Sequence, residues 1–119
     1  MSSMEVQVFG SKKNPETRAA LRFFAERRIK THFVDFGVRG PAVGELTRFA
    51  QKFGVSGILD AGSKRFQALG WGSARYSDER WLEKLADEPM ALRMPLVRYR
   101  QRLTVGAAEP EWKAWVESP

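Results

Sequence analysis

The chain has 119 residues, of which 43% are hydrophobic, so its length suits one domain with a packed core and is too short for two ordinary domains. It contains no cysteine, which excludes a disulfide framework, a thiolate metal site and a cysteine nucleophile. The formal net charge of +6 would attract nucleic acid, acidic proteins or small oxyanions, but a solvated surface rich in arginine explains the charge equally well.

The start of the chain lacks the basic segment and apolar run of a signal peptide. No apolar run approaches the roughly 20 residues that a membrane-spanning helix needs. We therefore expect a cytoplasmic protein that forms a single domain over residues 1–119 and has no membrane partner.

The N-terminal segment predicts a strand followed by a helix. Residues 4–9 alternate between apolar and polar side chains, as in a short strand. Asn14 is suited to cap a helix, and Pro15 fits its first position. Apolar residues at helical spacing then continue to residues 27–28, where two arginines favour the end of the helix.

The same order is predicted once more in the next segment. Residues 31–36 are rich in β-branched and aromatic side chains, which favours a strand. A second helix is expected to begin at Pro41 and to end at Gly54. The succession of strand, helix, strand and helix predicts a parallel β-α-β unit.

The middle of the chain predicts short helices. Residues 56–68 indicate one or two helical turns broken by Gly57 and Gly62. Ser77 or Asp78 can cap a further helix. This region is expected to form an all-helical insertion between the two halves of a sheet.

The last segment predicts two strands and a helix. Residues 95–99 and 102–105 suit an antiparallel hairpin, and a terminal helix is expected to begin at Glu109. The complete order is that of an α/β, thioredoxin-like fold: a four-stranded mixed sheet with flanking helices and the all-helical insertion. The four tryptophans are expected in the core and at helix-packing positions.

Four segments, in this order and spacing, are similar to one known family. Residues 6–14 resemble its first strand and active-site loop, and residues 30–36 resemble its second strand. Residues 57–60 resemble the "xxLLN" turn after its second helix, and residues 94–97 resemble its strand start with an arginine and a proline. Together they resemble the arsenate reductase (ArsC), Spx and YffB family along nearly the whole chain.

The resemblance implies that the family's nucleophile is missing. Its cysteine position is taken by Asn14, and the second cysteine of Spx-like members falls at Thr17. In the family, a thiolate at a helix N-terminus has a depressed pKa and attacks arsenic, whereas an amide forms no such covalent intermediate. The resemblance therefore implies a degenerate member of the family, a pseudoenzyme without the thiol chemistry of its relatives. No cofactor is expected.

The resemblance also implies where the other family positions fall. The arginine after the "LLN" turn falls at Gly62, and a shift of a few residues would bring Lys64 or Arg65 there instead. The arginine and proline before the third strand fall at Met94 and Pro95. The family's fold implies a cis peptide bond between these two residues.

The loop before the first helix, together with basic residues nearby, suggests a site for a small oxyanion. Such a site would use the helix N–H groups and charged side chains. The residues predicted for it are Ser11, Lys12, Lys13, Asn14, Arg18 and Arg93. The alternative is that Asn14 only caps its helix, because Pro15 removes one donor.

These observations favour a non-catalytic binding or regulatory protein. Spx contacts RNA polymerase, so the resemblance implies a protein partner in the transcription machinery. One alternative is a reductase that uses glutathione or another external thiol near Asn14 and Lys13. Another is non-specific binding of nucleic acid through the basic residues around the hairpin. A plainer explanation of these residues is a charged edge strand that discourages aggregation. Those residues are Arg93, Arg98, Arg100 and Arg102.

Overall fold

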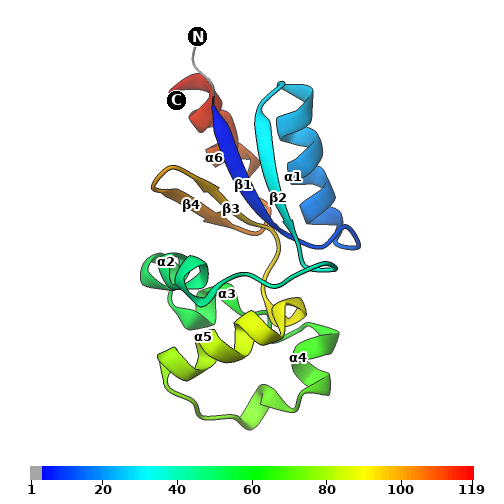
Figure 1. The fold of residues 1–119 in the computed structure, drawn as a ribbon, viewed down its shortest axis with the longest axis vertical. Helices are drawn as coiled ribbons and strands as arrows, with labels where there is room; N and C mark the ends of the chain where they lie inside the picture. Colours follow the sequence, from blue (N-terminus) through cyan, green and yellow to red (C-terminus); the bar gives the residue numbers. More distant parts are fainter. Residues whose placement is uncertain (1–3) are drawn as a thin grey trace.

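A four-stranded sheet with two helices forms one end of the molecule, and a group of short helices forms the other (Figure 1). The structure is a computed structural model and describes residues 4–119. The molecule is elongated, with principal extents of 48 × 26 × 23 Å. The elements in chain order are β1 (Glu5–Gly10), α1 (Pro15–Glu26), β2 (Lys30–Asp35), α2 (Val43–Phe53), α3 (Val55–Ile58), α4 (Lys64–Ala68), η1 (Trp71–Ser73), α5 (Asp78–Asp87), η2 (Pro89–Ala91), β3 (Leu96–Tyr99), β4 (Arg102–Val105) and α6 (Glu109–Glu117).

The sheet has the order β2-β1-β3-β4. β1 runs parallel to β2, in a register that sets Val8 beside Phe33, and antiparallel to β3. β3 and β4 form an antiparallel hairpin. The predicted parallel unit, the hairpin and the four-stranded mixed sheet are therefore confirmed.

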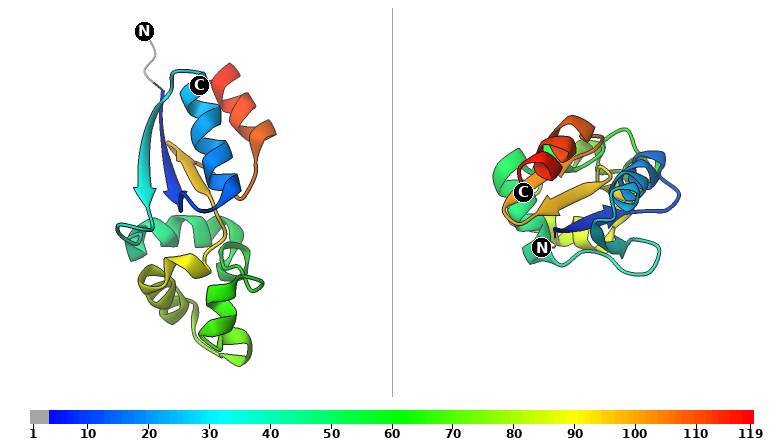
Figure 2. Two further views of the ribbon diagram at one scale, coloured as in Figure 1. Left: turned by 90° about the vertical axis from the view of Figure 1, so that its right-hand side faces the viewer. Right: turned by 90° about the horizontal axis from the view of Figure 1, so that it is seen from above.

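Alternating side chains of β1 divide the core between the two faces of the sheet. Val6 and Val8 pack with α1 and α6, which lie together on one face (Figure 2). Phe9 points to the opposite face, where its ring meets Phe49 of α2 edge-on at 6.0 Å. The expected positions of the tryptophans are confirmed, because Trp71, Trp112 and Trp115 are buried and Trp81 is half-buried.

Two helix boundaries differ from the prediction. α2 begins at Val43 and not at Pro41, because Ala42 is extended and its backbone N–H bonds to the Glu45 carboxylate at 2.8 Å. Gly57 lies inside α3 and does not break it, because buried Val55 and Ile58 anchor one side of this short helix. Both differences arise from contacts that a helix start or stop signal in the local sequence does not reveal.

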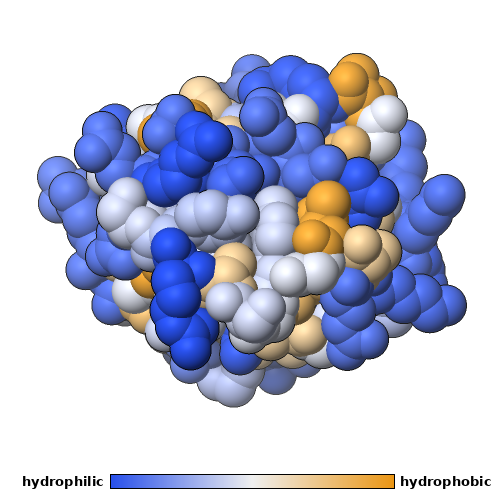
Figure 3. All heavy atoms as spheres, turned by 90° about the horizontal axis from the view of Figure 1, so that it is seen from below, coloured by the Kyte–Doolittle hydropathy of each residue, from blue (hydrophilic) through white to orange (hydrophobic). Residues whose placement is uncertain are grey.

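The predicted all-helical insertion runs from α3 to η2 and lies beyond one end of the sheet (Figure 1). Aromatic rings hold its far end together: Trp71 and Trp81 meet at 5.4 Å between centroids, and Tyr76 meets Trp81 at 4.9 Å. The surface seen from this end is largely hydrophilic with isolated apolar side chains (Figure 3). Across residues 4–119, no helix has the length and apolar character needed to cross a membrane.

Candidate functional site

α1 begins at a capped turn. The side-chain Oδ1 of Asn14 accepts hydrogen bonds from the Thr17 backbone N–H at 2.7 Å and from the Thr17 hydroxyl at 2.9 Å. Thr17 is 0% exposed, and the backbone N–H of Arg18 bonds to the Asn14 carbonyl at 3.1 Å. Pro15 has no N–H, so the helix end offers few donors to a ligand. The carboxamide oxygen of Asn14 is thus committed to capping.

A cleft of about 1160 Å³ separates this helix start from α4 and from the segment that leads into β3. Four segments far apart in the sequence line it, around residues 13–16, 60–68, 90–94 and 106–107. Its charged lining residues are Lys13, Glu16, Asp60, Lys64, Arg65 and Arg93. The cleft therefore has four cationic and two acidic side chains, an excess that favours an anionic ligand.

A short pairing brings the segment before β3 into the cleft. The backbone N–H of Arg93 bonds to the Ile58 carbonyl at 2.8 Å, and that of Asp60 bonds to the Ala91 carbonyl at 2.8 Å. The Arg93 guanidinium also donates from Nε to the Leu59 carbonyl at 3.2 Å. These bonds fix the stem of the Arg93 side chain at the cleft while its charge stays exposed.

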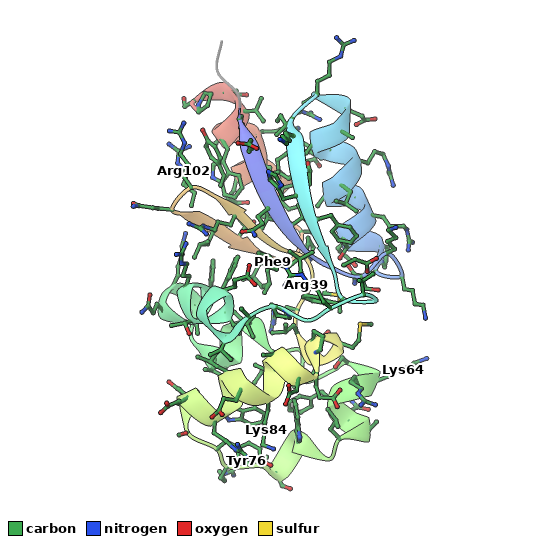
Figure 4. All side chains as sticks on the ribbon, viewed as in Figure 1. Phe9, Arg39, Lys64, Tyr76, Lys84 and Arg102 are labelled. Carbon is green, nitrogen blue, oxygen red and sulfur yellow. The ribbon has the colours of Figure 1, made fainter. Side chains whose placement is uncertain are left out.

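α4 supplies the opposite wall. The Ser63 hydroxyl accepts from the Phe66 N–H at 3.1 Å and caps the helix, which sets Lys64 and Arg65 in its first turn. Lys64 projects from α4 into solvent (Figure 4). Arg65 forms two hydrogen bonds of 2.8 Å with the Glu88 carboxylate, and these bonds, helped by the guanidinium charge, lower the pKa of Glu88. Much of the Arg65 charge is therefore balanced within the protein.

Residues 9–115 of the chain match the ArsC family. The protein belongs to the ArsC family. The arsenate reductase of Neisseria meningitidis serogroup A is 26% identical to it over 105 residues, which cover 86% of this chain and 90% of the relative.

Solved structures share the fold of this chain. The arsenate reductase from Vibrio cholerae matches with a TM-score of 0.78 at 19% identity, over 97% of this chain and 98% of that chain. The YFFB protein matches with a TM-score of 0.82 at 19% identity, over 92% of this chain and 96% of that chain. The predicted thioredoxin-like fold is confirmed. The chain contains no cysteine, which is consistent with the loss of a catalytic cysteine.

Some of the predicted site residues meet in the cleft. Lys13, Asn14, Arg93 and Met94 all line it. The peptide bond between Met94 and Pro95 is cis, as the resemblance implied. Pro95 itself is buried behind the cleft lining.

Other predicted residues organise the loop and are outside the lining. The buried Ser11 hydroxyl accepts from the Lys13 N–H at 3.1 Å. The Arg18 guanidinium donates to the Lys12 carbonyl at 2.8 Å. Thr17 is occupied by its bonds to Asn14. These side chains hold the helix start in place.

The three residues considered for the family's arginine after the second helix lie in different places. Gly62 lies in the turn before α4 and outside the lining, whereas Lys64 and Arg65 line the cleft.

Several other lining residues, among them Asp60, Ser63 and Met90, were not predicted as site residues. Their residue types give no signal in the sequence, because only the pairing around Arg93 and the cap of α4 bring them together. Across the described part of the chain, no three His, Asp or Glu residues gather to hold a metal ion.

Proposed function

We propose that this ArsC-family protein has no reductase activity of its own and acts as a binding protein whose cleft takes a small oxyanion. One observation carries the proposal. At the helix start, the position that the family resemblance gives to the nucleophile, Asn14 has a carboxamide oxygen committed to Thr17. A carboxamide is not a nucleophile that can form a covalent bond to arsenic or sulfur at neutral pH.

The charges of the cleft support an anionic ligand. Lys13, Lys64 and Arg93 come from three separate segments and leave their charges exposed. Of the two acids in the lining, Asp60 accepts a hydrogen bond from the Gly62 N–H at 3.1 Å. An oxyanion with several oxygens can accept charge-assisted hydrogen bonds from more than one of these cations.

Calorimetric titration with phosphate, arsenate and sulfate tests the proposal. We expect saturable binding that Arg93→Ala weakens about tenfold, since a charge-assisted hydrogen bond is lost. Arg22→Ala is the matched control, because Arg22 is exposed on α1 and outside the cleft lining. An equal loss of affinity in both variants would mean that net charge alone attracts the anion. If the wild type shows no saturable binding, the proposal of an oxyanion ligand is wrong.

A reductase that uses an external thiol is the enzymatic alternative, because related proteins are described as arsenate reductases. In that case the cleft would hold the oxyanion while glutathione supplies the attacking sulfur. Arsenate reduction is measured with glutathione and glutaredoxin, and we expect no turnover above the blank without protein. If the wild type reduces arsenate and Arg93→Ala does not, the protein is a reductase and the binding proposal is wrong.

A protein partner, in the transcription machinery by similarity to Spx, is the regulatory part of the proposal. Tagged protein is retrieved from its native cells at physiological salt, alongside the Arg93→Ala variant. Specific retention of a transcription component supports the regulatory role. If no transcription component is retained, the regulatory role is wrong, and the result of the oxyanion titration still stands.

A further inference from the structure

A second hollow, separate from the cleft, lies between α2 and the β3-β4 hairpin. Its volume is about 560 Å³, and it shares no lining residue with the cleft. In Figure 1, α2 and the hairpin lie on the left of the molecule, whereas the start of α1 and α4 lie on the right. We call it the basic groove; its lining is Arg48, Gln51, Lys52, Arg98, Arg100, Gln101 and Leu103.

The basic groove gathers charge of one sign. Four of its lining residues are cationic and none is acidic. None of the four takes part in the salt bridges found among residues 4–119. Glu45, the acidic residue of α2, accepts hydrogen bonds from the Ala42 N–H and from the Gln7 carboxamide. Within residues 4–119, therefore, no salt bridge pairs a cation of the groove with an acidic side chain.

Backbone acceptors hold two of the four cations without neutralising them. The Lys52 ammonium donates to the Leu103 carbonyl of β4 at 3.2 Å, and the Arg98 guanidinium donates from Nε to the Arg100 carbonyl at 2.7 Å. Arg100 has a φ of 56°, in the left-handed region that a residue with a side chain adopts at a cost. A guanidinium held through Nε still presents its two terminal nitrogens to another group.

A charged edge strand explains only part of this arrangement. β4 is an edge of the sheet, and charges along it discourage pairing with another chain. Arg48 and Lys52, however, come from α2, a helix that contacts the sheet through Phe49 and Phe9 and is not part of its edge. Two elements thus bring like charges together, which lowers stability unless a partner of opposite charge binds between them.

We propose that the basic groove binds an acidic, extended peptide segment of a partner protein. Arginine side chains match carboxylates with paired hydrogen bonds. The carboxamides of Gln51 and Gln101 can donate to and accept from the peptide groups of such a segment. This site is independent of the oxyanion proposed for the cleft.

The groove suits nucleic acid less well. No aromatic side chain lines it, so unstacked bases find no ring to stack on. The nearby Tyr99 is 2% exposed and packs with Trp115 on the other face of the sheet.

Fluorescence anisotropy with labelled deca-glutamate tests the proposal, with labelled deca-glutamine and a decathymidylate oligonucleotide as comparisons. The test variant is Arg48→Gln with Arg100→Gln. The matched control is Arg22→Gln with Arg75→Gln, because it removes the same charge from exposed residues outside the groove. All four residues are exposed, so neither variant disturbs the core.

We expect the groove variant to lose about tenfold or more in affinity for deca-glutamate and the control to lose about twofold at most. Deca-glutamine should not bind. An equal loss of affinity in both variants would mean that net charge alone attracts the peptide and would overturn the proposal. The proposal would also be overturned if the oligonucleotide bound more tightly than deca-glutamate and lost this affinity in the groove variant. Arg93→Ala should lower the affinity for deca-glutamate no more than the control does, so failure of the cleft proposal and failure of this one can be told apart.

Discussion

Replacing Asn14 by alanine should destabilise the protein by removing a single oxygen atom that two donors share. Both donors belong to Thr17, whose side chain is 0% exposed. The substitution deletes the cap of α1 and leaves the buried hydroxyl without its acceptor.

The two losses can be estimated separately. Loss of an asparagine cap costs about 1 kcal/mol. A buried hydroxyl that loses its partner adds about 1 kcal/mol, the lower end of the range because threonine can rotate toward another acceptor. We therefore expect Asn14→Ala to lower the free energy of unfolding by about 2 kcal/mol. In a Thr17→Val background the same change should cost only about 1 kcal/mol, since no hydroxyl remains to be orphaned.

Urea denaturation followed by tryptophan fluorescence measures these free energies. Asn14→Asp is the matched control, because its carboxylate keeps the accepting oxygen and favours the helix N-terminus. It should stay within about 0.5 kcal/mol of the wild type. A loss of less than about 0.5 kcal/mol in Asn14→Ala, or an equal loss in Asn14→Asp, would refute the role of this oxygen as a cap.

Further outcomes follow from single contacts. Thr104→Val should cost about 1–3 kcal/mol in urea denaturation, because it removes the buried acceptor 2.9 Å from the Trp112 indole N–H. The hydrogen bonds from the Arg65 guanidinium lower the pKa of Glu88. The wild type should therefore have a higher free energy of unfolding than Glu88→Gln at pH 7, and this difference should shrink as the pH falls below about 4.3. A difference that grows in acid would contradict this. Asn14→Cys should give a thiol with a pKa below about 7.5 by iodoacetamide kinetics, and Ala19→Cys, exposed on the same helix, should stay near about 8.5. Equal pKa values would show that the helix start no longer activates a thiol.

Local signals in the sequence predicted the elements well. Asn14 and Ser77 cap their helices, and Gly54 ends α2, as expected. Each of these signals depends on atoms within a few residues, so no tertiary contact is needed to read it. The start of α2 was misplaced at Pro41 because Glu45 and the extended Ala42 set the boundary.

The arginines near the hairpin show what the sequence could not separate. Arg93, Arg98 and Arg100 form one basic group in the sequence, but they lie in two different sites. Arg93 lines the cleft because its backbone pairs with Ile58. Arg98 and Arg100 line the basic groove with residues of α2, about 50 positions earlier in the chain.

The missing thiol is determined by the sequence alone, because 119 residues without cysteine cannot supply a sulfur nucleophile in any conformation. The order of strands and helices is also encoded locally. Only the tertiary structure decides which charges share a site, since hydrogen bonds across the sheet and between distant loops set those distances. The cleft joins Lys13, Lys64 and Arg93 from three distant segments, and that meeting is a property of the fold.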